Sequence, residues 1–290
     1  MQSDLSKHAS TNTASSTRIN DQIDFPECAR ELIHSGWSIN KLPIALQAHF
    51  WDALDLYANV GSDVKSEFSF PDHTDGFLPF GMEYAKATHQ PDLCERYCYW
   101  HKDRRRHEAH AFSGSEFYRA ICGYESGISE VAQGVLDSIC GFFNVSDPVD
   151  IRNSSYIQLC AYHKPPRRPD REYLQNRHED GHLLSIIKGN RDGLVIFPRG
   201  ERLVVRLADD EMIVITGSLL TLLSDNRIPY MDHAVTNPCV PVARLSIVYF
   251  VIPDLTRKYT SFMNCKQLDL VAVANESHQA FGNNPFSAAA

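Results

Sequence analysis

The second half of the sequence consists of short apolar, β-branched segments that Gly, Asp, Asn and Pro separate from one another. Such segments are typical of β-strands, and the separating residues are typical of turns. No amphipathic helical pattern lies between them, so a run of seven or more strands favours an antiparallel barrel or a jelly roll. The predicted strands are 156–162, 183–188, 194–198, 202–207, 212–216, 219–223 and 243–252.

The first half has a helical pattern. Apolar residues at three- and four-residue spacing predict two helices between Pro26 and about Val60, and one long amphipathic helix from Phe117 to Phe142. The stretch 61–114 is rich in Gly, Pro and aromatic residues, which predicts a long ordered loop. We expect these helices to cover an outer face of the barrel, because each element must bury its apolar side.

We expect three parts along the chain. Residues 1–20 are rich in Ser, Thr and Asn and predict a flexible tail. Residues 21–147 form the amino-terminal helical region, and residues 148–290 form the jelly-roll core with a short helix near the end.

Charge and composition narrow the classes of partner. The net charge is −8, from 36 acidic and 28 basic residues, which disfavours nucleic acid and anionic membrane surfaces. The amino terminus lacks the apolar core of a secretory signal, and the eight cysteines contain no C-x-x-C pair. We therefore expect a cytoplasmic protein with reduced thiols and a small-molecule partner.

The segment His178-Glu179-Asp180-Gly181-His182 matches H-E-x-x-H, the pattern of zinc proteases. That function requires a helix, because helical spacing places both histidines on one metal. The Pro-rich stretch upstream, Gly181 inside the motif and the β-rich residues after it all disfavour a helix.

On a strand, the same segment gives a different metal site. His178 and Asp180 stand two residues apart, so their side chains lie on one face and can share a metal ion, while Glu179 points away. Fifty-two residues separate Asp180 from His233, enough for several strands to return the chain to the site. Two histidines and one carboxylate form the facial triad of non-haem Fe(II) oxygenases.

Arg244 and Ser246 occupy alternate positions in an apolar strand, so both face the same side. A buried arginine among Leu, Ile and Val needs a partner. Its planar fork suits a carboxylate, and the serine hydroxyl adds a donor. This pair predicts a carboxylate receptor inside the barrel, with a structural ion pair as the alternative.

The order H-x-D, then His, then R-x-S resembles the isopenicillin N synthase-like branch of the 2-oxoglutarate-dependent oxygenases. The likeness extends to Gly193-Leu194 after the metal strand, to the segment 222–227, which is similar to the family's "LSNGR", and to the strand 156–162, where Tyr162 stands at the co-substrate tyrosine. The family's "NYYPP" is replaced here by the segment 160–166.

This resemblance implies a double-stranded β-helix, a cupin-like jelly-roll barrel of the α+β class. It implies that His178, Asp180 and His233 bind Fe(II), and that Arg244, Ser246 and Tyr162 bind 2-oxoglutarate. Decarboxylation of 2-oxoglutarate with O2 would then drive hydroxylation, desaturation or oxidative cyclisation of a small molecule in secondary metabolism, such as an amino acid or a natural-product intermediate.

Two other functions agree with the same residues. One is an oxidase of this fold that does not consume 2-oxoglutarate, and the other is a barrel that binds a small ligand without catalysis. The basic residues Arg104 to Arg106 predict a solvated loop, with a carboxylate-bearing substrate as the alternative. His107 and His110 are expected to face solvent.

Overall fold

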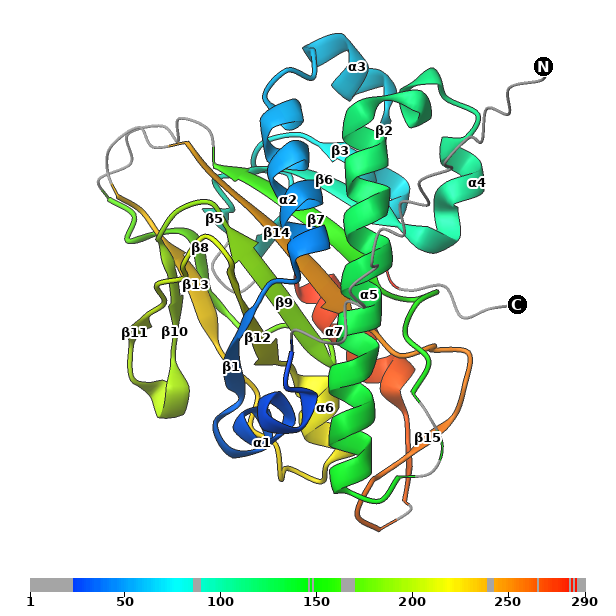
Figure 1. Ribbon diagram of the computed structural model, residues 1–290, viewed down its shortest axis with the longest axis vertical. Helices are drawn as coiled ribbons and strands as arrows, with labels where there is room; N and C mark the ends of the chain where they lie inside the picture. The colour runs from blue at the N-terminus through cyan, green and yellow to red at the C-terminus, as the bar shows by residue number, and fades with distance from the viewer. Residues whose placement is uncertain are drawn as a thin grey trace, which may run out of the picture.

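Two antiparallel β-sheets form the centre of the computed structural model (Figure 1). The structure describes residues 23–285 with gaps at 86–89, 146, 148, 163–169, 239–242, 265, 282 and 284. The expected tail 1–20 and most of the basic, Pro-rich segment after Tyr162 lie outside the described residues.

The larger sheet has eight strands and the smaller one has four. The larger sheet follows the order β1-β12-β9-β14-β7-β6-β3-β2, and the smaller sheet follows β11-β10-β13-β8. Two further strand pairs, β4 (Tyr84–Ala85) with β5 (Gln90–Pro91) and β15 (Tyr259–Thr260) with β16 (Gln267–Leu268), lie outside these sheets. The strand bounds are β1 Trp37–Lys41, β2 Ser69–Phe70, β3 Asp75–Leu78, β6 Glu95–Trp100, β7 Tyr156–Tyr162, β8 Tyr173–His178, β9 Leu184–Gly189, β10 Leu194–Ile196, β11 Leu203–Val204, β12 Glu211–Thr216, β13 His233–Thr236 and β14 Arg244–Val251.

Strand β14 is almost continuously apolar because both of its faces are buried. Leu245, Ile247 and Tyr249 belong to the cluster on the helical side of the sheet. Val248 and Phe250 alternate with them and belong to a second cluster, between the two sheets. A strand that is buried on both faces needs apolar side chains in both directions. The large sheet is therefore the middle layer of the fold.

Helices α2 (Ile44–Tyr57) and α5 (Glu116–Phe142) run side by side over the outer face of the large sheet, as Figure 1 shows. Ser115 begins α5, because its hydroxyl accepts a hydrogen bond from the Tyr118 backbone N–H at 3.1 Å. The family's double-stranded β-helix and the helices that cover it are thus both confirmed. The remaining helices are α1 Phe25–Ser35, α3 Ser62–Glu67, α4 Arg104–His107, α6 Ser218–Leu223 and α7 Leu270–Ala280.

Three local predictions were wrong. The segment 219–223 is the helix α6, because Leu219, Leu220 and Leu223 bury one helical face, a pattern that a short apolar run does not distinguish from a strand. The stretch 61–114 is not one loop, since it contains β2, β3 and β6, and β1 also joins the large sheet. His107 is buried, because its Nε2 lies 2.6 Å from Asp75 Oδ2 and its Nδ1 lies 3.0 Å from the Tyr118 hydroxyl.

Among the described residues, none of the helices combines the length and the apolar character that crossing a membrane requires.

The packing of α2 against α5 predicts a large loss of stability in Phe50→Ala. Phe50 is fully buried and its ring lies 6.2 Å from that of Tyr124. Removing it should lower the free energy of unfolding by about 3–5 kcal/mol, because a cavity remains. The control Ile44→Ala, at a 69% exposed position on the same helix, should change it by less than about 0.5 kcal/mol. Chemical denaturation measures both, and equal effects would contradict this packing.

Candidate metal and co-substrate site

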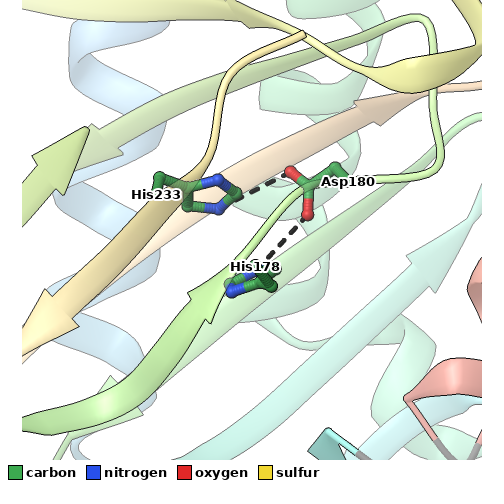
Figure 2. A group of neighbouring side chains, drawn as sticks. All are labelled: His178, Asp180 and His233. Atoms are coloured by element: carbon green, nitrogen blue, oxygen red, sulfur yellow. Dashed lines mark ion pairs between the residues drawn. The ribbon is translucent and has the colours of Figure 1, made fainter. Parts of the chain in front are cut away.

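Three side chains predicted to bind metal meet between the two sheets. His178 is the last residue of β8, and His233 is the first residue of β13, its paired partner in the small sheet. Asp180 follows β8 in a loop, so the expectation that it continues the strand was wrong. The turn after His178 nevertheless brings the carboxylate back to both histidines (Figure 2).

The distances fit a shared cation. Asp180 Oδ1 lies 3.4 Å from His178 Nε2, and Asp180 Oδ2 lies 3.6 Å from His233 Nε2. One ligand atom from each residue lies within 4.8 Å of the other two. Asp180 and His233 are buried, and His178 is half-buried. Two imidazole nitrogens and one carboxylate oxygen match the donor set of non-haem Fe(II).

Neighbouring groups hold two of these ligands in place. His178 Nδ1 lies 2.7 Å from the Asn176 carbonyl oxygen, so Nδ1–H donates there and Nε2 faces Asp180. The Ser185 hydroxyl donates to Asp180 Oδ2 at 2.5 Å. Such outer contacts fix the orientation of metal ligands. Ser185 was not predicted from the sequence, although it is a polar residue within the apolar strand β9.

The shared carboxylate separates the two histidines electrostatically. Burial lowers the pKa of His178, but the hydrogen bond and charge of Asp180 outweigh burial and raise it to about 9. Burial lowers the pKa of His233 to about 4, despite the nearby Asp180 charge. Burial would raise the pKa of Asp180, yet His233 and His178 hold it below its ordinary range. The charged carboxylate is thus the stable form in this site.

The zinc-protease interpretation of the same segment has no support in the structure. Residues 179–183 are not helical, and His182 does not belong to the group of potential metal ligands. Glu179 Oε2 accepts a hydrogen bond from the Ser218 backbone N–H at 3.3 Å, away from the histidines. His182 instead contacts Phe250, with ring centroids 4.6 Å apart.

The second predicted group forms at the start of β14. Arg244 and Ser246 are buried, and the arginine Nη1 donates to the serine Oγ at 3.2 Å. Gly189 and Gly193 leave room for the guanidinium, because an added Cβ would lie 3.3 Å from Nη2 and from Nε respectively. Among the described residues, Nε of Arg244 is buried with no hydrogen-bond partner. An unused buried donor of this kind fits a carboxylate ligand.

Tyr162 lies between Arg244 and the cavity that contains His178 and Asp180. Arg244 pairs with Tyr162 across β14 and β7, and its guanidinium carbon lies 5.1 Å from the tyrosine ring centre. The Tyr162 hydroxyl donates to Gln175 Oε1 at 3.1 Å. Gln175 lines the same cavity as His178 and Asp180. Tyr162 therefore lies between the two parts of the site.

The cavity beside the metal ligands is narrow. Its volume is about 30 Å³, and α7 contributes Ser277 and His278 to its wall. The Phe281 ring, just after α7, lies 5.1 Å from the His178 ring. No sequence signal placed the chain end there, because nothing in a local pattern reveals where a terminal helix packs.

Two of the three arginines in the run 104–106 pair with acidic side chains. Arg106 pairs with Asp75 and Asp103, at 3.4 and 3.2 Å, and Arg104 lies 3.5 Å from Glu108. Arg177 likewise pairs with Asp232 at 2.6 Å. These arginines therefore give no support to a carboxylate-bearing substrate.

A two-histidine, one-carboxylate group lies inside the double-stranded β-helix, and a buried Arg-x-Ser begins β14. Non-haem Fe(II) oxygenases use this set of metal ligands. Residues 154–253 match the sequence profile of the 2OG-Fe(II) oxygenase superfamily. The chain therefore contains a 2OG-Fe(II) oxygenase domain, and its isopenicillin N synthase-like features fit this superfamily. It is an Fe(II)- and 2-oxoglutarate-dependent dioxygenase.

Solved structures agree on the fold. A full-length Neurospora crassa protein in complex with alpha-KG (2-oxoglutarate) superimposes with a TM-score of 0.67, 18% identity and coverage of 84% of this chain and 87% of that chain. A Caulobacter crescentus protein of the 2OG-Fe(II) oxygenase family gives a TM-score of 0.67 at 20% identity, with coverage of 83% and 87%. A rice dioxygenase for auxin oxidation gives 0.63 at 16% identity, with coverage of 79% and 77%. A search of curated protein sequences found no match.

The geometry predicts that each triad residue is needed for metal binding. His178→Ala, Asp180→Ala and His233→Ala should each lose stoichiometric Fe(II) binding in anaerobic equilibrium dialysis and keep their circular dichroism spectra. Glu179→Ala is the matched control, since its carboxylate faces Ser218, and it should bind one Fe(II) per chain. Unchanged binding by His233→Ala would contradict the site.

Fe(II) affinity should rise with pH. Below a pKa of about 9, His178 carries a proton that the metal must displace, whereas His233, with a pKa of about 4, is already neutral near pH 7. Affinity should therefore increase by up to about tenfold per pH unit as the pH rises from roughly 6.5 toward 9, and level off above about pH 9. Dialysis at several pH values measures this slope, and a flat profile would contradict the protonated His178.

Proposed function

We propose that this dioxygenase binds one Fe(II) through His178 Nε2, an Asp180 oxygen and His233 Nε2, and binds 2-oxoglutarate through Arg244, Ser246 and Tyr162. The observation that carries the proposal is the convergence of three ligand atoms within 4.8 Å, beside a buried arginine with an unused Nε. Bound iron supplies the activation of O2 that is coupled to oxidative decarboxylation of 2-oxoglutarate.

The protein's own contribution is orientation. The Asn176 carbonyl keeps the His178 proton on Nδ1, so Nε2 is available as a ligand. Ser185 holds Oδ2 of Asp180, so the carboxylate cannot rotate freely between the two histidines. The three ligands are thereby set before the metal arrives, which reduces the entropy lost on binding.

Arg244 supplies the charge that a distal carboxylate needs. Gly189 and Gly193 let the chain pass close to the guanidinium, and Ser246 is its only described hydrogen-bond partner. A planar guanidinium can donate two parallel hydrogen bonds to a carboxylate. Tyr162 packs beside it and, through Gln175, borders the cavity that contains His178.

Aromatic residues exclude water from the cavity beside the proposed iron ligands. Tyr156, Phe250 and Phe281 line the cavity next to His178. A dry site strengthens the electrostatic contacts of the bound groups and protects reactive species.

We propose a small-molecule substrate that contacts the side chains lining this cavity. Hydroxylation, desaturation and oxidative cyclisation all agree with a carboxylate ligand at position 180. Two Neurospora crassa structures of similar fold contain thymine or 5-formyluracil, which supports small molecules in general. A place in secondary metabolism, and a cytoplasmic location that suits the free thiols of Cys28, Cys94 and Cys160, are part of the proposal.

Arg244→Ala should weaken 2-oxoglutarate binding roughly ten- to hundredfold, because loss of a charge-assisted hydrogen bond costs about 1.5–3 kcal/mol. Ser246→Ala should cost about 0.5–1.5 kcal/mol, as expected for one neutral hydrogen bond. Anaerobic titration of the Fe(II)–2-oxoglutarate charge-transfer absorption measures both.

Arg257→Ala is the matched control, since Arg257 pairs with Asp147 on the surface and should leave the titration unchanged. Arg244→Lys should recover only part of the affinity, because an ammonium keeps the charge and loses the planar fork. An Arg244→Ala midpoint equal to that of wild type would show that the arginine serves another partner.

A further inference from the structure

One polar side chain in the cavity has hydrogen-bonding capacity that the described protein leaves unused. Gln158, on β7, is 3% exposed and lines the cavity together with His178 and Asp180. Its Oε1 accepts from the Cys98 thiol at 3.7 Å, and its Nε2 donates to the Cys160 sulfur at 3.4 Å. A carboxamide has two N–H donors and two acceptor lone pairs, and thiols are weak partners. One N–H and one lone pair therefore remain for a ligand.

Structural stability alone does not account for this glutamine. It stands between Tyr156 and Cys160 on the inner face of β7 and pairs across strands with Val248 and Cys98. An apolar side chain would fill this position without burying an amide whose partners are only thiols. A buried amide with spare donors and acceptors is better explained by a ligand that completes its hydrogen bonds.

The charges around the cavity disfavour an anionic substrate. Arg96 lies two residues from Cys98 on the same face of β6, but it pairs with Asp92 at 2.6 Å and with Glu83. Glu83 lines the cavity, as does Asp180, and among the described lining residues there is no lysine or arginine. A carboxylate placed here would find no lysine or arginine partner among the described lining residues, so a neutral molecule is favoured.

The walls favour a flat molecule. The Phe250 ring lies 4.9 Å from Tyr156 and 4.6 Å from His182. The Phe281 ring closes the other side, 5.1 Å from His178. Aromatic side chains bind planar rings by stacking and edge contacts. The same cavity thus offers flat apolar surfaces and one amide at its edge.

We propose that Gln158 determines substrate specificity, and that the substrate is a neutral planar ring whose edge carries an N–H beside a C=O, as in a cyclic amide. This inference rests on the proposed function, because that function places the reacting centre beside these residues. The glutamine N–H donates to the ring carbonyl, and its carbonyl oxygen accepts from the ring N–H. Glutamine recognises the donor–acceptor edge of adenine by the same paired geometry.

The test compares three small probes by calorimetry under argon, with protein loaded with Fe(II) and 2-oxoglutarate. The probes are 2-pyridone, N-methyl-2-pyridone, which lacks the N–H, and benzoate, which is an anion. Wild type should bind 2-pyridone at least about tenfold more tightly than either of the others, because a buried polar group left unpaired costs about 1–3 kcal/mol. Gln158→Met should lose this preference and bind both pyridones equally.

Two further variants complete the design. Gln158→Glu keeps the shape and the acceptor for the ring N–H but lacks the donor to the ring carbonyl. It should therefore bind 2-pyridone less tightly than wild type and still prefer it to N-methyl-2-pyridone, a result that a folding defect would not produce. Gln267→Met, at an exposed position on β16, should bind all three probes as wild type does.

The charge-transfer absorption of the same samples is read before each titration. It tests the proposed function separately from the role of Gln158. Absence of this absorption in wild type would count against the proposed function, whereas the calorimetric preference still reports on Gln158. A normal absorption with equal 2-pyridone affinity in wild type and Gln158→Met would overturn the role of Gln158. Tighter binding of benzoate than of 2-pyridone would overturn the neutral substrate class.

Discussion

The Asp180 carboxylate, buried between two histidines, is the interaction on which the rest of the site depends. A buried carboxylate is costly unless opposite charge and hydrogen bonds compensate it. Here His178, His233 and the Ser185 hydroxyl all face it, at 3.4, 3.6 and 2.5 Å. The hydrogen bond and charge of the carboxylate favour the protonated form of His178, whereas burial favours neutral His233, which is why their pKa values separate. The protein keeps one displaceable proton and two nitrogen ligands in a prearranged group.

The two sheets make this arrangement possible. The small sheet brings His178 and His233 together as a cross-strand pair, while the large sheet contributes Arg244 and the inner face of β7. Because β14 is buried on both faces, its inner side can carry an arginine at one end and Phe250 near the metal ligands at the other. Helices α2 and α5 supply the apolar support that keeps this strand fixed.

Most strands of the second half, the two long covering helices and the residues that meet at the candidate site could be predicted from the sequence, because alternation along a strand and motif order are local signals. Prediction failed where the outcome depended on distant contacts. Segment 219–223 became a helix because of what its leucines pack against, and His107 is buried because Asp75 reaches it from another strand. The closure of the cavity by Phe281 and the role inferred for Gln158 both depend on chain segments that meet only after folding.

The central claim is that iron held by the Asp180 group couples O2 to 2-oxoglutarate. The most direct measurement is the ratio of succinate formed to O2 consumed by the Fe(II)-loaded wild-type protein, with 2-oxoglutarate and a library of small ring compounds. The account predicts one succinate per O2, faster turnover with a substrate than without one, and no succinate from Asp180→Ala. Consumption of O2 without succinate would contradict it and would favour an oxidase of the same fold.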